Sequence, residues 1–185
     1  MPKFFIFLDK YNNRILQNNN IKIGVIYRNY QALNREIELI KIAKFCKRKR
    51  YQLFVSNDIR LAIKYKADGV YIPSFNKVKV FKNLEKKRIK VIGSAHNQQE
   101  IHKKKIQNCH AIFLSPIFKT EKNKKFLGIQ KFNYITLRNN IKILGLGGIN
   151  TDNIRQLKLF KIKGFGGKSI FKKKTGLLKA GFHKD

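Results

Sequence analysis

Six short apolar runs of this chain each end in a small polar cluster, and these clusters contain the candidate catalytic and ligand-binding residues. The apolar runs are rich in Val, Ile, Leu and Phe, as are parallel strands whose two faces are covered by helices. The clusters are Ser56-Asn57-Asp58, Ile72-Pro73-Ser74, Gly93-Ser94-Ala95-His96, Ser115-Pro116, Gly147-Gly148-Ile149-Asn150 and Gly166-Gly167-Lys168-Ser169. Because an α/β barrel carries its ligand-binding loops at the carboxyl ends of its strands, the clusters are predicted to line one binding mouth.

The last two clusters predict a phosphate site. Glycines such as Gly148 let backbone N–H groups approach a ligand closely, and N–H groups at the start of a following helix attract phosphate. The loops after the last two strands are the usual phosphate site of a barrel. Lys168 or Ser169 could add a side-chain donor. The alternative is that these glycines only form tight turns.

A carboxylate, an arginine and a histidine at other strand ends could bind a metal ion and an anion. Asp58 could bind Mg²⁺, which prefers hard oxygen ligands, or it could simply cap the following helix. Arg28 could bind an anion through two N–H groups, and His96 could contact a phosphate, act in acid–base chemistry or be structural. The chain has no Ser-His-Asp order, no histidine cluster with metal-ligand spacing and no nucleotide P-loop.

The elements that must position these residues alternate along the chain. Predicted strands cover 3–8, 21–28, 53–56, 69–72, 91–92, 111–114 and 141–146, and Phe165 opens the last strand. Predicted helices cover 13–18, 34–50, 58–65, 78–87, 98–106, 132–139 and 152–160, with a short helix within 172–185. This alternation predicts a compact (β/α)8 TIM barrel formed by residues 1–185 as a single domain. A doubly wound open sheet competes, but no Gly-x-Gly-x-x-Gly follows the first strand.

Composition places the chain among globular proteins. Its 43% hydrophobic content argues against disorder, and no apolar run approaches the ~18 residues that cross a bilayer, so no membrane partner is expected. The apolar run at 4–8 lacks the small-residue cleavage site of a signal peptide. Cys46 and Cys109 fit reduced thiols, and a cytoplasmic location is predicted.

The charge is strongly positive, with 42 Lys and Arg against 10 Asp and Glu and a net charge of +32. Such a balance is typical of nucleic-acid binders. The alternative is compositional drift, because Lys, Asn, Ile and Phe are enriched together, although drift should also permit more Glu. A barrel that serves as a scaffold for a polyanion or nucleic acid is therefore a third, less favoured hypothesis.

Six motifs in order along the chain resemble those of the thiamine-phosphate synthase/TenI family. The similarity runs from the second strand over nearly the whole chain. It is carried by Ser56-Asn57-Asp58, Ala67-Asp68-Gly69-Val70-Tyr71, Gly93-Ser94-Ala95-His96, Ser115-Pro116-Ile117-Phe118 with Thr120, Gly147-Gly148-Ile149-Asn150 and the closing glycine-rich run. The resemblance implies a (β/α)8 barrel. In the synthase branch it implies a transferase that joins hydroxymethylpyrimidine diphosphate to thiazole phosphate with loss of pyrophosphate.

The resemblance also implies roles for particular residues. Arg28 and Asp58 would be catalytic, with Arg28 on the pyrophosphate and Asp58 on Mg²⁺. Substrate-binding roles fall to Asn57 and Ser94 on the pyrimidine, to Thr120, Gly148, Lys168 and Ser169 around the thiazole phosphate, and to His96 and Lys122. The implied partners are phosphorylated pyrimidine and thiazole small molecules. A homo-oligomer is left open.

The chain also departs from the family pattern. Ile26-Tyr27-Arg28-Asn29-Tyr30 keeps only the arginine of the family's Gln-Leu-Arg-x-Lys, and Asn76 replaces a second Mg²⁺ carboxylate. Asn123 falls where a lysine is expected, with Lys122 and Lys124 beside it, and Pro116 stands where the TenI tautomerases have a histidine. The alternative function is therefore a divergent TenI-like barrel that binds a thiazole or thiamine phosphate without synthase activity.

Overall fold

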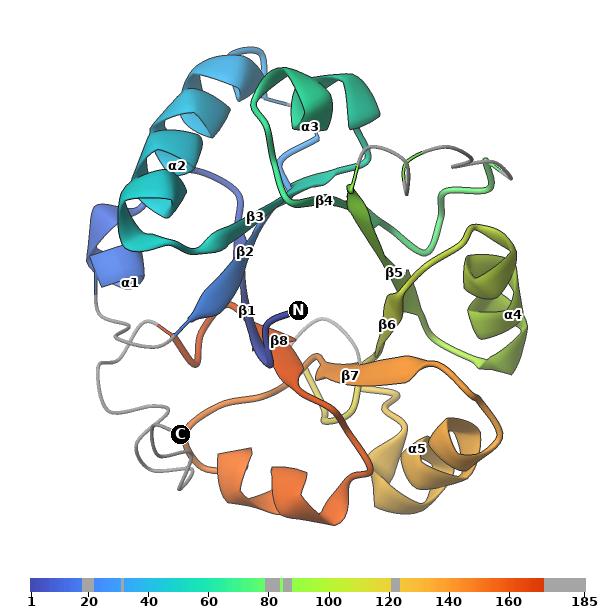
Figure 1. Ribbon diagram of the computed structural model, residues 1–185. Coiled ribbons are helices and arrows are strands. Elements are labelled where there is room, and N and C mark those ends of the chain that lie inside the picture. Colours follow the sequence, from blue (N-terminus) through green and yellow to red (C-terminus); the bar gives the residue numbers. More distant parts are fainter. Residues whose placement is uncertain (18–21, 31, 79–83, 85–87, 121–123, 172–185) are drawn as a thin grey trace.

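The chain forms a closed barrel of eight parallel strands, as Figure 1 shows for a computed structural model. The structure describes residues 1–17, 22–30, 32–78, 84, 88–120 and 124–171. The strands are β1 (Phe4–Leu8), β2 (Ile23–Tyr27), β3 (Gln52–Ser56), β4 (Gly69–Ile72), β5 (Lys90–Ala95), β6 (Ala111–Leu114), β7 (Lys142–Leu146) and β8 (Phe165–Gly167). Each strand pairs with the next, and β8 pairs with β1, so the predicted barrel is confirmed and the open sheet was wrong.

Helices surround the strands on the outside of the barrel (Figure 1). They are α1 (Asn13–Gln17), α2 (Arg35–Lys49), α3 (Ile59–Lys64), α4 (Gln98–Ile106), α5 (Gly128–Leu137) and the 3-10 helix η1 (Ile154–Leu159). In α2 the buried residues Leu39, Ile42 and Phe45 recur at the spacing that places them on one helix face. Within the described residues, no helix is both long enough and apolar enough to cross a membrane.

Most predicted elements are present, and the differences are local. β5 extends from Lys90 to Ala95, beyond the predicted 91–92, and α5 begins at Gly128 rather than at 132. The predicted helix at 152–160 is the 3-10 helix η1. Residues 79–83, 85–87 and 172–185 lie outside the described residues, so the helices expected at 78–87 and in the tail stay predictions.

Aromatic side chains fill the barrel interior. Phe5 and Phe7 from β1 each pack edge to face on Phe113, with ring centres 5.3 Å apart. Phe7 also packs edge to face on Tyr71, with ring centres 5.4 Å apart. The rings fit because glycine lies opposite them: a Cβ at Gly166 would lie 2.8 Å from atoms of both Phe7 and Phe113. The barrel interior is therefore a packed core. The rings of Phe7, Tyr71 and Phe113, which lie nearer the carboxyl ends of their strands, form the aromatic floor beneath the predicted mouth.

We predict that Gly166→Ala destabilises the protein by about 1–3 kcal/mol, because its methyl group would overpack the barrel interior. Urea denaturation of the variant and the parent measures this difference. Adding Phe113→Leu to Gly166→Ala should recover part of the loss. Equal unfolding midpoints for Gly166→Ala and the parent would contradict the packing described here.

Candidate functional site

Polar residues from several strands gather at the carboxyl end of the barrel. Side chains alternate along a strand, so a residue two positions beyond an inward-facing one faces the same way. Phe7 and Phe54 face the interior, and Asp9 and Ser56 follow them by two positions. Other residues of this mouth are Arg28 after β2, Tyr71 on β4, Ser94 on β5 and Lys168 after β8. The sequence thus brings most of the predicted strand-end residues to one face of the barrel.

Asp9 lies between two cations from neighbouring strands. Its Oδ1 is 3.6 Å from Arg28 Nε, and its Oδ2 accepts a hydrogen bond from Lys168 Nζ. Burial alone would raise the pKa of Asp9, but the hydrogen bond from Lys168 and the charge of Arg28 outweigh it and lower the pKa below its ordinary value. The family resemblance implied that Lys168 contacts the thiazole phosphate, whereas here its ammonium contacts Asp9, which follows β1.

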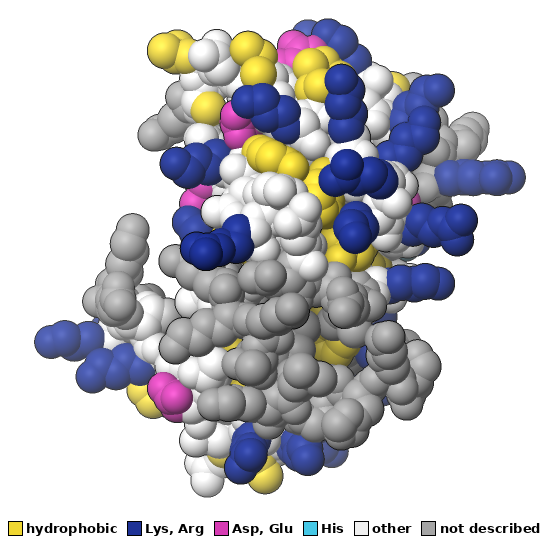
Figure 2. Space-filling model, turned by 90° about the vertical axis from the view of Figure 1, so that its left-hand side faces the viewer, with side chains coloured by type: hydrophobic (Ala, Val, Ile, Leu, Met, Phe, Trp, Pro, Cys, Tyr) yellow, Lys and Arg dark blue, Asp and Glu magenta, His cyan; other side chains and the backbone are white. Residues whose placement is uncertain are grey.

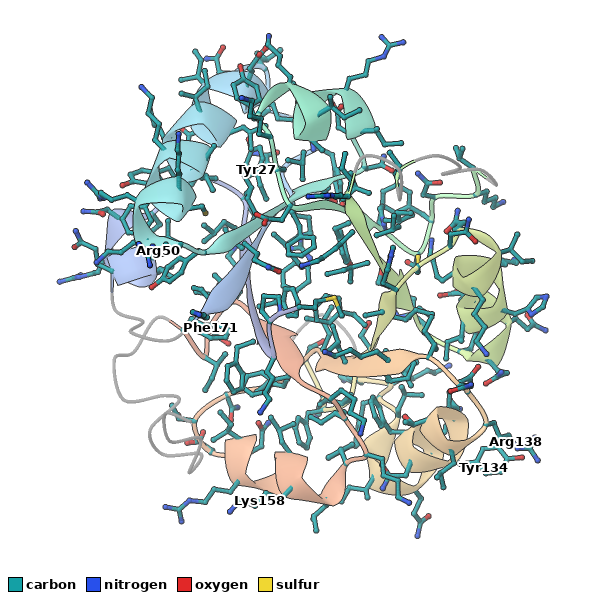
Figure 3. All side chains as sticks on the ribbon, in the orientation of Figure 1. Tyr27, Arg50, Tyr134, Arg138, Lys158 and Phe171 are labelled. Atoms are coloured by element: carbon teal, nitrogen blue, oxygen red, sulfur yellow. The ribbon has the colours of Figure 1, made fainter. Side chains whose placement is uncertain are left out.

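Asp58 is engaged by protein groups on both oxygens. Its Oδ1 caps α3 by accepting a hydrogen bond from Leu61 N at 2.9 Å, and its Oδ2 lies 3.3 Å from Arg35 Nη1. Arg35 also donates to the carbonyl of Ser56 and lies 5.7 Å from the centre of the Tyr27 ring. Tyr27, labelled in Figure 3, donates its hydroxyl to the Arg35 carbonyl. Arg35 is therefore fixed beside Asp58, and sequence reasoning did not find it.

Asn57 and Asn76 meet at the rim of the mouth. Asn57 has a φ of 56°, and its Oδ1 accepts a hydrogen bond from Asn76 Nδ2 at 2.5 Å. The other amide atom of Asn76, Oδ1, accepts from Val78 N at 2.8 Å. The predicted proximity of the β3 and β4 loops is thus present, but the oxygen of Asn76 is already bonded within its own loop.

The donor set does not fit Mg²⁺ at Asp58. Both carboxylate oxygens of Asp58 and the side-chain oxygen of Asn76 already accept hydrogen bonds or an ion pair. Within the part of the chain that the structure describes, no group of three or more His, Cys, Asp or Glu side chains could hold a metal ion. The metal expected from the family resemblance is therefore not confirmed.

Hydroxyl groups line the wall of the mouth between β2 and β5. Ser56 Oγ donates to Tyr30 OH at 2.9 Å, and Tyr30 packs on Phe75 with ring centres 5.7 Å apart. Burial raises the pKa of Tyr71 to about 12, against a side-chain hydrogen bond with Ser94 that lowers it. Burial likewise raises the pKa of Tyr30, so both hydroxyl groups are neutral at physiological pH. Sequence reasoning assigned neither a role, although strand alternation could have placed Tyr71 inside.

His96 links two strand ends. Its Nδ1 lies 2.8 Å from the Ser115 carbonyl and 3.3 Å from Ser115 Oγ, and its backbone N–H donates to Glu100 Oε2 at 2.8 Å. This places His96 across the ends of β5 and β6. These contacts agree with the structural alternative and leave its substrate-binding role a prediction.

The loops after β6, β7 and β8 meet at the other side of the mouth. Gly147 and Gly148 have φ values of 92° and 74°, which favour glycine. A Cβ at Gly148 would lie 2.6 Å from the carbonyl oxygens of Phe118 and Lys119, the residues just before Thr120. Ser169 Oγ donates to the Ile149 carbonyl at 3.4 Å. The structure therefore brings Gly148, Ser169 and the Thr120 loop together, while Lys122 lies outside the described residues.

A buried lysine supports the loop that carries Asn76. Lys104 is 1% exposed, and its ammonium donates to the Pro73 carbonyl at 2.7 Å and to the Asn76 carbonyl at 3.3 Å. Gln107 accepts from Lys104 at 2.9 Å and donates to the carbonyls of Asn76 and Val78. Burial lowers the pKa of Lys104, which Cys109 and Glu100 partly oppose. No role was predicted for Lys104 from sequence, because a lysine between two other lysines in a helix is usually exposed.

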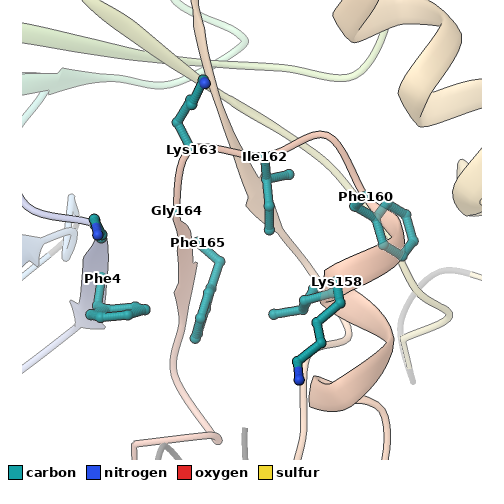
Figure 4. A pocket seen from close by; sticks show the side chains of 9 residues that line it. Phe4, Lys158, Phe160, Ile162, Lys163, Gly164 and Phe165 are labelled. Atoms are coloured by element: carbon teal, nitrogen blue, oxygen red, sulfur yellow. The ribbon is translucent and has the colours of Figure 1, made fainter. Parts of the chain in front are cut away.

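A separate pocket of about 380 Å³ lies away from the mouth. Figure 4 shows Phe4, Phe160, Ile162 and Phe165 on its apolar walls, with Lys158 and Lys163 beside them. Its lining residues come just before β1 and β8 in the sequence or are the first residues of these strands, so the pocket lies toward their amino ends. It includes none of the predicted site residues.

Basic side chains extend far beyond the mouth. In the described part of the face that Figure 2 shows, Lys and Arg side chains are numerous, with few Asp and Glu among them. Cations also lie on aromatic rings at the surface, such as Arg138 over Tyr134 at 4.3 Å, both labelled in Figure 3. This distribution does not test the nucleic-acid hypothesis.

Comparisons with known proteins point in one direction. The family model described as thiamine monophosphate synthase matches residues 13–168. A thiamine-phosphate synthase from Prochlorococcus marinus subsp. pastoris is 37% identical over 125 residues, which is 65% of this chain and 35% of that relative. The chain thus spans a minor part of the length of this curated relative. A putative thiamine-phosphate synthase 2 from Aquifex aeolicus is 27% identical over 188 residues, covering 92% of this chain and 98% of the relative.

Solved structures support the fold. A thiamine phosphate pyrophosphorylase from Pyrococcus furiosus matches with a TM-score of 0.77 and 16% sequence identity, over 96% of this chain and 93% of that one. At this identity the likeness shows the barrel architecture alone.

We predict that Lys104→Met destabilises the protein by about 2 kcal/mol, because the carbonyls of Pro73 and Asn76 would lose a buried donor. Urea denaturation measures the change. Lys103→Met, on the exposed side of the same helix, is the matched control and should change stability by less than about 0.5 kcal/mol. Similar losses for both variants would mean that the buried ammonium has no special role.

We predict that Asp9→Asn reduces stability at about pH 7 and that the difference shrinks as the pH falls below about 4. The pKa of Asp9 is lowered from 3.8, so its contribution is present above that value and is lost as pH falls through the folded-state pKa. Urea denaturation at several pH values measures the difference between parent and variant. A difference that persists under acid conditions would contradict an ionic role for Asp9.

Proposed function

The chain belongs to the thiamine monophosphate synthase family, and we propose that it joins a hydroxymethylpyrimidine diphosphate to a thiazole phosphate with release of pyrophosphate. The observation that carries this proposal is a single mouth in which cations, hydroxyl groups and a glycine-rich loop meet above an aromatic floor. We further propose that residues 1–185 form one barrel domain of this kind.

Each part of the mouth suits one part of the two substrates. The half-exposed Arg28 and Lys168 would contact the diphosphate, and the aromatic floor with Ser94 and Asn57 would contact the pyrimidine ring. Gly148, Ser169 and Thr120 would surround the thiazole phosphate, with Lys122 as a further donor. His96, at the ends of β5 and β6, would border the pyrimidine side.

The reaction needs no protein nucleophile. The bond between the pyrimidine methylene carbon and the diphosphate oxygen breaks, and the thiazole nitrogen supplies the electron pair of the new C–N bond. Cations beside the leaving group stabilise the charge that develops on it, and holding both substrates in one mouth removes the entropy cost of their encounter. Mg²⁺ would add to this stabilisation when bound, but the engaged oxygens of Asp58 and Asn76 do not fit it, so no step is assigned to it.

One observation favours a second function, a TenI-like barrel that binds a thiazole or thiamine phosphate without forming it. Asn76 carries no charge where the synthase pattern has a carboxylate, and Asp58 is bound to Arg35. Such a barrel would keep the Gly148 and Ser169 loops, which suit a phosphate group, and would lack turnover of the diphosphate.

Incubating the protein with both substrates and following thiamine phosphate by chromatography tests the proposal, with and without Mg²⁺. We expect turnover above the uncatalysed rate, and Arg28→Gln should lower kcat/KM by about 100-fold because it removes a cation from the leaving group. Arg138→Gln on the outer surface is the matched control. If the protein binds thiazole phosphate tightly but forms no product with or without Mg²⁺, the synthase proposal is wrong and the second function is supported.

A further inference from the structure

The two carboxylates near the diphosphate end of the mouth are held by different kinds of contact. Asp58 is 28% exposed and Arg35 is 16% exposed, so their ion pair is largely shielded from water. Arg35 Nε is also buried and has no hydrogen-bond partner, so this part of the guanidinium is shielded from water as well. A metal ion on Asp58 would have to displace a shielded cation, so Arg35 already occupies the position that a metal ion would take.

Asp9 is held by contacts that a ligand can replace. Arg28, Lys168 and Asp9 are 42%, 52% and 39% exposed, so solvent and ligands reach all three side chains. One carboxylate oxygen faces each cation, as two oxygens of a phosphate group would. Exposed ion pairs of this kind contribute little to stability, so exchanging one anion for another costs little.

The charges in this cluster favour an anionic ligand. Arg28, Arg35 and Lys168 carry three positive charges against the two negative charges of Asp9 and Asp58, which leaves one positive charge in excess. A diphosphate carries more charge than the single carboxylate it would replace, and it can contact both cations with several oxygens. Tyr30 lies on the same side of the mouth, and because its hydroxyl accepts a hydrogen bond from the buried Ser56, its own neutral O–H can be donated to the remaining oxygens.

We infer that a diphosphate binds directly to Arg28 and Lys168 in place of the Asp9 carboxylate, with Arg35 standing where a metal ion on Asp58 would be. This inference rests on the proposed function, because it concerns the diphosphate-bearing substrate of the same mouth. Asp9 then acts as an internal competitor of the ligand. Its removal should strengthen binding of the diphosphate even though the folded protein loses an ion pair.

Calorimetric titration of the full chain with inorganic pyrophosphate tests the inference, once with EDTA and once with excess MgCl₂. We expect binding in EDTA to be at least as tight as in MgCl₂, because side-chain cations hold the anion and Mg²⁺ in solution competes with them for pyrophosphate. Binding that is more than about tenfold weaker in EDTA would overturn the inference, since it would show a metal contribution of that size. This comparison uses the parent protein and does not depend on the folding of any variant.

Variants test the role of Asp9 separately. Asp9→Asn should tighten pyrophosphate binding in EDTA about threefold to fivefold, the scale of a half-exposed ion pair. Glu36→Gln removes the same charge from a surface pair with Lys64 and should leave the Kd within about twofold. Arg28→Gln and Lys168→Gln should each weaken binding about tenfold. Unchanged or weaker binding by Asp9→Asn, with a folded circular-dichroism spectrum, would overturn the inference, and Asp9→Ser serves if Asp9→Asn does not fold.

The outcomes separate this inference from the proposed function. Thiamine phosphate formation only in the presence of Mg²⁺, with metal-dependent pyrophosphate binding, would keep the function and overturn the inference. Metal-independent pyrophosphate binding that Asp9→Asn strengthens, without any turnover, would support the inference and overturn the synthase function. An absence of pyrophosphate binding in both buffers would overturn the inference, whatever the turnover assay shows.

Discussion

Closure of the sheet around a packed aromatic interior is the constraint on which the rest of the structure depends. Because β8 pairs with β1, each strand presents alternate side chains to a space that the rings of Phe5, Phe7 and Phe113 fill. These rings pack against one another, and the predicted strand-end residues lie in the layer above them. The same alternation decides which residue of each strand end faces that layer. Pairing of β8 with β1 then brings Asp9 and Lys168, far apart in sequence, into contact.

The architecture was predictable from sequence because buried parallel strands are continuous apolar runs with polar ends. The same rule failed at β5, where Gly93, Ser94 and Ala95 continue the strand although they read as a loop. The sequence also did not distinguish an α-helix from the 3-10 helix η1, because apolar residues three positions apart fit both kinds of helix. Buried Lys104 was hidden for a different reason: its partners are backbone carbonyls of a distant loop, and a carbonyl has no signature in sequence.

The candidate site was predictable in its location and only partly in its contacts. Strand ends fixed where Asn57, Ser94 and Gly148 would lie, since neighbouring parallel strands end on the same side. Whether Asp58 caps a helix or binds a metal ion depends on Arg35, which is 23 residues away and could not be paired with it from sequence. Lys168 was placed near one phosphate by family likeness, but its distance to Asp9 is set by closure of the barrel, which spacing along the chain does not encode.

A resident carboxylate also sets a selectivity threshold in a protein with a net charge of +32. Chloride, acetate and other monovalent anions are abundant around such a surface, and an uncovered pair of cations would collect them. Asp9 is a tethered monovalent anion at high local concentration, so an untethered rival of equal charge gains nothing by replacing it. If a diphosphate replaces Asp9 as we infer, only a solute with greater charge and more oxygens has an advantage, and the mouth then selects ligands by charge before it selects them by shape.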